Sequence, residues 1–118
     1  MPTSRSFRCS TAAWWSSNAN QHYTTDALSD AVFRELCRRA EVPVQRYSNR
    51  ADLPGGSTLG NISTSHLSIP SVDIGLPQLA MHSCCEVAGV RDTEALARVM
   101  TAYFSAGIRR LPGGGMAL

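Results

Sequence analysis

The stretch TTDALSDAVFRELCRRAEVPVQRY, residues 24–47, decides the fold class. It opens with Thr24, Thr25 and Asp26, which are residue types that cap helix N-termini. Apolar side chains then recur at the spacing of an amphipathic helix of about four turns: Leu28, Val32, Phe33, Leu36, Cys37 and Ala40. Pro43 follows that helix, and residues 42–47 alternate as a short strand does. A helix followed at once by a strand favours an α/β layer.

The pattern continues on the C-terminal side as helix, strand and helix. Residues 57–67 predict a short second helix after a glycine-containing loop, and residues 71–75 predict a buried strand. Asp92 is expected to cap a last helix, with an apolar stripe made of Leu96, Val99, Met100, Tyr103 and Phe104. The order helix-strand-helix-strand-helix indicates an α/β layered sheet. Because two strands do not make an independent sheet, the chain is expected to be part of a larger domain.

The two ends of the chain differ from its body, residues 18–106. Residues 1–17 are rich in Ser, Thr and Arg and show neither helical nor strand periodicity, so they form an atypical N-terminal segment. Residues 107–118 contain Pro112 followed by a run of glycines, and we expect them to be a flexible tail.

Composition excludes several classes of protein. The chain has 118 residues, 43% apolar and 17% charged, which suits one globular domain and argues against disorder. Its eleven basic residues are scattered arginines and the net charge is only +2, whereas a nucleic-acid-binding protein would show a dense basic face. No stretch approaches the ~20 apolar residues of a membrane span. With neither a secretory signal nor a disulfide framework among its four cysteines, a cytoplasmic location is expected.

Three stretches carry residues of chemical interest, and each also has a plain structural interpretation. His82 follows a strand end and a Pro turn, where ligands of α/β proteins commonly lie. Imidazole is a common zinc ligand, but a zinc site needs several ligands, so spacing alone favours an ordinary histidine. The glycines before the second helix either bring backbone N–H groups to an anion or form a tight turn. His22 and Tyr23 either face a ligand or belong to the N-cap segment of the first helix.

These stretches together resemble one family. They are Gln21-x-Tyr23-Thr24-Thr25, then Asn49-Arg50-x-Asp52-x-x-Gly55-Gly56-Ser57-Thr58-Leu59-Gly60-Asn61, then Val72-Asp73-Ile74-Gly75-Leu76-Pro77-Gln78-Leu79-Ala80-Met81-His82-Ser83-x-x-Glu86. From about Asn18 to about Phe104 the chain is similar to the aspartyl aminopeptidase family, metallopeptidase family eighteen, which includes vacuolar aminopeptidase I.

The resemblance implies the C-terminal part of a zinc exopeptidase-type α/β/α catalytic domain. Members of the family are several times longer, bind two zinc ions, assemble into large homo-oligomers and remove N-terminal residues, often acidic ones, from peptides. In this sequence the resemblance implies that His82 ligates one zinc ion and that Tyr23 contacts the substrate. It places four further residues beside the substrate pocket: Gly55, Gly56, Ser57 and Thr58.

The same resemblance places the general base and the other zinc ligands upstream of the residues present. A two-metal site activates water and polarises the scissile carbonyl, and a glutamate accepts the proton. This chain would supply one ligand and no base, so it is expected to be a fragment that is inactive alone. An alternative is a non-catalytic interaction module that associates with full-length aminopeptidase subunits. A small unrelated α/β binding domain would require the His82 motif to be a coincidence.

One departure from the family lies in the N-terminal segment. The family's substrate-binding lysine, seven residues before the tyrosine, corresponds to Ser16, and the apolar strand that leads to it is replaced by RCSTAAWW, residues 8–15. A hypothesis is that residues 9–16 are translated out of frame, because reading one base earlier can give Val-Leu-Asn-Gly-Gly-Val-Val-Val. The nucleotide sequence tests this. A gene in which no nearby frame encodes such a strand followed by lysine contradicts it.

Overall fold

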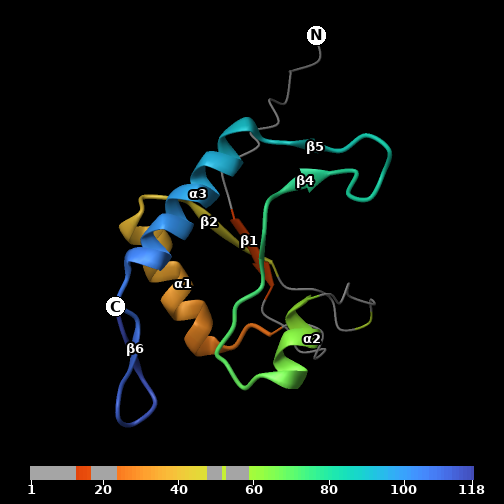
Figure 1. The fold of residues 1–118 in the computed structure, drawn as a ribbon. Coiled ribbons are helices and arrows are strands. Elements are labelled where there is room, and N and C mark those ends of the chain that lie inside the picture. The colour runs from red at the N-terminus through yellow and green to blue at the C-terminus, as the bar shows by residue number, and fades with distance from the viewer. Residues whose placement is uncertain (1–12, 17–23, 48–51, 53–58) are drawn as a thin grey trace.

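The structure, a computed structural model, describes residues 13–16, 24–47, 52 and 59–118. Its elements in chain order are β1 (Ala13–Ser16), α1 (Ala27–Arg39), β2 (Val44–Tyr47), α2 (Leu59–His66), β3 (Ile74–Gly75), β4 (Gln78–Leu79), β5 (Val87–Ala88), α3 (Val90–Ser105), β6 (Arg109–Arg110) and β7 (Met116–Ala117). The predicted order of helices and strands is present as α1, β2, α2, β3 and α3 (Figure 1). The α/β fold class is confirmed.

The main sheet is built around a strand that the sequence did not predict. Its order is β2-β1-β3, with β1 parallel to β2 and antiparallel to β3. Ala13 lies opposite Val44, and Trp15 lies opposite Ile74. The prediction that the N-terminal segment has no strand is therefore wrong for residues 13–16. A central strand takes its structure from pairing on both sides, so its own alternation is a weak signal.

Helix α1 begins at the last of its three predicted cap residues. Asp26 is the N-cap, and its Oδ1 accepts a hydrogen bond from the backbone N–H of Ser29 at 2.7 Å. Ser29 Oγ in turn accepts from the N–H of Asp26 at 3.0 Å, which completes a capping box. The hydrogen bond from the Ser29 backbone is the main cause that lowers the pKa of Asp26. The strand after the helix starts at Val44, just beyond Pro43, slightly later than predicted.

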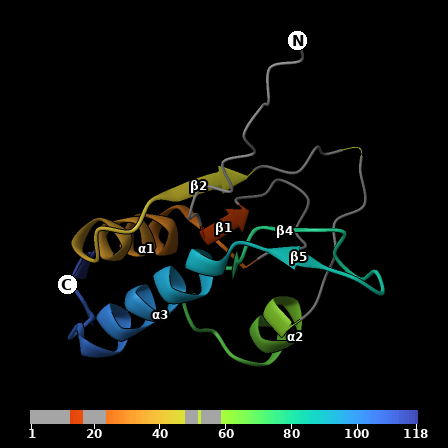
Figure 2. The same ribbon diagram turned by 90° about the horizontal axis from the view of Figure 1, so that it is seen from above.

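One apolar core lies between the helix pair α1 and α3 and the sheet. Its buried members come from both helices and from the link between α1 and β2: Phe33, Cys37, Val42, Ala95 and Val99. Val44, Val72 and Ile74 pack against this cluster from the sheet side and are partly buried. The strand predicted to be buried at residues 71–75 is therefore only partly buried. Figure 2 shows α1 and α3 side by side, with α2 set apart from both. The core has no member from α2.

The start of α3 differs from the prediction. The helix begins at Val90 with Gly89 as its N-cap, so the assignment of Asp92 as the cap is wrong. Asp92 lies in the first turn and is only 1% exposed. A Cβ atom at Gly89 would meet the Asp92 carboxylate at 2.3 Å, so any larger residue at the cap position would force that carboxylate to shift. A carboxylate in the first turn is favoured by the helix dipole, and this is the signal that resembled a cap.

Several large apolar side chains are exposed in two regions. We call the first the apolar α2 surface; it consists of Leu59, Ile62, Leu67 and Ile69, each more than half exposed. The second is the β4–β5 hairpin, with Leu79, Met81 and Val87. The predicted stripe of α3 is wrong at its end, because Tyr103 and Phe104 are 46% and 77% exposed. The last α3 residue in the core is Val99, so the final turn extends beyond the surface that α1 and the sheet cover.

The C-terminal segment carries a second small hairpin. β6 pairs antiparallel with β7, and the N–H of Leu111 donates to the carbonyl of Gly115 at 2.8 Å. Gly113 and Gly114 adopt φ of +99° and +95°, which the turn between the strands requires. Residues 107–118, expected to be a tail, therefore contain two short strands. Among the described residues, no helix has the length and apolarity needed to cross a membrane.

The capping box gives a stability prediction. Asp26→Ala removes the acceptor of the Ser29 N–H and should lower the free energy of unfolding by about 1 kcal/mol. Because the folded-state pKa of Asp26 is lowered, this contribution is present above the unfolded-state pKa and is lost as the pH falls through the folded-state value. Urea unfolding at neutral and acidic pH measures it, with the exposed Glu94→Ala on α3 as the control. Equal losses for both variants at neutral pH would contradict the capping role.

Candidate functional site

His82 lies in the turn of the β4–β5 hairpin, which hydrogen bonds hold closed. It is exposed and has a left-handed φ of 69°, and Ala80 in the same turn has a φ of 56°. The backbone N–H of His82 donates to Oε1 of Glu86, and the N–H of Ser83 donates to the carbonyl of Ala80 at 3.0 Å. These bonds join both sides of the turn. His82 is therefore held on a closed loop that Figures 1 and 2 place on the opposite side of the molecule from α1.

The described residues do not complete a metal site around this histidine. Among them, no group of three or more His, Cys, Asp or Glu side chains could hold a metal ion. A catalytic zinc ion takes three protein ligands and an open position. His82 with its neighbours in the described ranges therefore does not fit a whole zinc centre.

The motif residues meet at a different point, the side chain of Asp73. Asp73 Oδ2 accepts from the backbone N–H of Thr24 at 2.6 Å and from Thr24 Oγ1 at 3.1 Å. The N–H of Asp73 donates to Thr25 Oγ1 at 2.8 Å, and Thr25 forms an isolated parallel bridge with Ser71. Hydrogen bonds to a carboxylate are stronger than those between neutral groups. The segment before β3 is thus fastened to the segment before α1.

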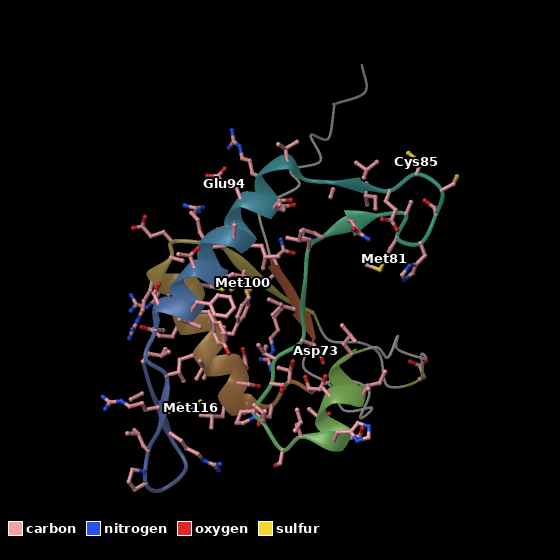
Figure 3. All side chains as sticks on the ribbon, in the orientation of Figure 1. Asp73, Met81, Cys85, Glu94, Met100 and Met116 are labelled. Carbon is pink, nitrogen blue, oxygen red and sulfur yellow. The ribbon has the colours of Figure 1, made fainter. Side chains whose placement is uncertain are left out.

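Helix α2 approaches the same carboxylate through a glycine. A Cβ atom at Gly60 would lie 2.7 Å from Asp73 Oδ1 and 3.0 Å from Thr24 Cγ2, both closer than normal packing allows. Gly60 stands in the first turn of α2, where only the absence of a side chain permits this approach. Figure 3 shows Asp73 next to α2. We call Thr24, Thr25, Gly60 and Asp73 the Asp73 joint.

Of the predicted site residues, only His82 lies within the described part of the chain. The others fall outside the described residues: Tyr23, Gly55, Gly56, Ser57 and Thr58. The joint residues were quoted among the motif residues of the sequence, where Thr24 and Thr25 were expected only as candidate helix caps and Gly60 and Asp73 were given no role. One signal was available, because a glycine inside a helical pattern costs about 1 kcal/mol relative to alanine and so calls for a structural reason. The partner of that approach, Asp73, could not be read from spacing.

Comparisons with known proteins extend this picture. The sequence profile of the family described as Aminopeptidase I zinc metalloprotease (M18) matches residues 12–104, a range that includes β1. A protein of Clostridium novyi named probable M18 family aminopeptidase 2 is 58% identical over 74 residues, which cover 63% of this chain and 17% of the relative. A protein of the same name from Pseudomonas putida strain GB-1 is 46% identical over 95 residues, which cover 80% and 22%.

Solved structures give the same result at the level of the fold. A chain in the cryo-EM structure of the Ape4 and Nbr1 complex matches with a TM-score of 0.75 and 33% identity, over 80% of this chain and 18% of the other. The crystal structure of prApe1 matches with a TM-score of 0.74 and 28% identity, over 80% and 20%. The fold and the matches therefore define the class, that of the zinc metalloproteases with an α/β domain.

Within that class the chain belongs to the M18 aminopeptidase family. It spans only about a fifth of the length of the curated relatives it matches. The recognition of the family from the motif residues is confirmed.

The close approach of Gly60 to Asp73 gives a testable prediction. Gly→Ala inside a helix normally gains about 1 kcal/mol, but Gly60→Ala should lower the free energy of unfolding by about 1–3 kcal/mol because the new methyl group displaces the Asp73 carboxylate. The control is Gly107→Ala, where a Cβ atom meets nothing within 4 Å. Chemical denaturation of both variants measures the difference.

A double-mutant cycle identifies the cause. In an Asp73→Ala background the penalty of Gly60→Ala should become smaller, since the oxygen atom at 2.7 Å is gone and only the contact with Thr24 Cγ2 at 3.0 Å remains. A stabilising Gly60→Ala in the parent chain, or an unchanged penalty in the Asp73→Ala background, would show that the carboxylate does not occupy this position.

Proposed function

We propose that the protein to which this chain belongs is a zinc-dependent aminopeptidase that removes N-terminal residues from peptides, and that His82 is one of its zinc ligands. The observation that carries the proposal is the position of His82 on the hydrogen-bonded turn of the β4–β5 hairpin, inside the range that matches the M18 family. An exposed imidazole on a closed turn is well placed to meet ligands from another part of the polypeptide. Two zinc ions are expected in the complete site.

We also infer that Tyr23 and the run Gly55–Thr58 contribute to the substrate pocket. Support comes from the Asp73 joint, because Thr24 and Gly60 are the described residues that closely follow these two stretches and lie against the same carboxylate. The substrate class is a peptide with a free N-terminus, and acidic residues at that end are expected. Nucleic acid and membrane are not expected partners.

The remaining zinc ligands and the general base are proposed to come from parts of the M18 polypeptide that this chain does not represent. This is supported by the described residues, which contain no group of three possible metal ligands. It is also supported by the small share of the relatives' length that the chain covers. The chain alone is accordingly proposed to be inactive. The complete protein is proposed to be a cytoplasmic homo-oligomer.

A chimera tests the ligand role of His82. Residues 12–104 of this chain replace the matching segment of an active full-length M18 relative, and His82→Ala in that chimera should lower turnover of an N-terminal Glu or Asp anilide by at least about a hundredfold and reduce bound zinc. The matched control is His66→Ala, which changes an exposed histidine of α2. A chimera that keeps its zinc and its activity after His82→Ala would rule out the ligand role.

In the chain by itself the same substitution should behave differently. Because His82 is exposed, His82→Ala is expected to change the free energy of unfolding by less than about 0.5 kcal/mol. A large loss of stability would show that His82 serves packing instead.

A second candidate function is favoured by the exposed apolar residues. We propose that the chain is a non-catalytic interaction module that associates with full-length M18 aminopeptidase subunits through the apolar α2 surface. Four large apolar side chains, on one short helix and the segment after it, are each more than half exposed, and exposed apolar residues of this kind favour association. The described strands β2 and β3 each have one neighbour in the main sheet, so both present an edge as well. This role requires no catalytic residue.

Size-exclusion chromatography with a full-length relative tests the association. The parent chain should co-elute with the relative, and Ile62→Glu should weaken that association at least about tenfold, because it puts a charge in place of an exposed apolar side chain of the apolar α2 surface. Leu111→Glu, an exposed apolar residue in the C-terminal hairpin, is the control and should have no effect. Separate elution of the parent chain and the full-length relative would contradict the proposed association.

A further inference from the structure

Two exposed thiols stand next to each other in the turn that holds His82. Cys84 and Cys85 are both free and both exposed. Ser83 holds the backbone of Cys85, because its Oγ donates to the carbonyl of Cys85 at 2.7 Å and accepts from the N–H of Cys85 at 3.2 Å. Figure 3 shows Cys85 at the tip of the hairpin. The pair is therefore displayed to solvent on a short turn with fixed backbone contacts.

The other described cysteine is protected from reagents. Cys37 is 1% exposed within the core, and burial raises the pKa of its thiol to about 11. A buried, protonated thiol is a poor nucleophile. Within the described ranges, the reactive sulfur of the folded chain is therefore confined to the Cys84–Cys85 pair.

The short distance between the Cα atoms of Cys84 and Cys85 determines which kind of ligand the two sulfurs can bind. Consecutive Cα atoms are about 3.8 Å apart, whereas the Cα atoms of ordinary disulfides are about 4.4–6.8 Å apart. A direct bond between the two sulfurs would be strained and easily reduced. An atom that bridges the sulfurs enlarges the ring and relieves this strain. Among the described residues no group of three possible metal ligands exists, so the bridging atom that suits this pair is one that two sulfur atoms satisfy.

We propose that Cys84 and Cys85 form a dithiol binding site for trivalent arsenicals. With phenylarsine oxide, two As–S bonds form, the bond between arsenic and oxygen and two S–H bonds break, and the two thiol protons leave with the oxygen as one water molecule. Arsenic remains trivalent, so neither an oxidant nor a reductant is needed. Attachment of the first sulfur makes the second attachment intramolecular, which raises the affinity about a hundredfold over that of a single thiol.

Intact mass spectrometry of the full chain tests the site, in a Cys9→Ser background because Cys9 lies outside the described residues. One phenylarsine oxide per chain should remain bound in excess 2-mercaptoethanol and be removed by a dithiol such as dithiothreitol. Cys84→Ser and Cys85→Ser should each weaken binding about a hundredfold. Peptide mapping with iodoacetamide should label the pair and leave Cys37 unlabelled.

Three results would overturn the proposal. The first is binding by either single-cysteine variant as tight as that of the pair. The second is loss of the arsenical to the monothiol at the same concentration that strips the variants. The third is labelling of Cys37 as fast as Cys84 and Cys85, because the selectivity of the pair depends on the burial of Cys37.

Discussion

The hydrogen bond from the Thr24 backbone to the Asp73 carboxylate is the constraint on which the arrangement of the motif residues depends. It fastens the segment before β3 to the segment before α1, across a sequence separation of 49 residues. Helix α2, which adds no residue to the core, meets the same carboxylate at Gly60. A partly buried carboxylate needs hydrogen-bond donors, which Thr24 supplies. Thr25 accepts from the Asp73 backbone and Gly60 packs closely against the carboxylate, so the four residues form one unit.

Features that depend on neighbouring residues were predictable from the sequence, and features that depend on distant ones were not. The apolar spacing of α1 and its cap at Asp26 are local, and both are present. Strand β1 was missed because its pairing partners, β2 and β3, lie far along the chain. Asp92 was mistaken for a cap because the cap position is defined by backbone geometry at Gly89. The motif around His82 identified the family, but the ligands that would complete a zinc site cannot be read from this chain.

The exposed residues are consistent with a catalytic domain of which this chain forms one part. Its core is covered by α1 and α3, whereas the apolar α2 surface and the apolar residues of the β4–β5 hairpin are open to solvent. His82 stands on that hairpin, which Figure 1 shows away from α1. The elements that hold the motif residues in place and the element that presents the histidine are therefore distinct.

Amide hydrogen exchange at Thr24 tests the Asp73 joint most directly. Thr24 lies outside every helix and strand, so its N–H is protected only if Asp73 accepts it. NMR-detected exchange of the folded chain should show Thr24 protected to an extent similar to the amides of the middle of α1. Exchange of Thr24 at the rate of an unstructured peptide, while the α1 amides stay protected, would contradict the joint and the arrangement of the motif residues that rests on it.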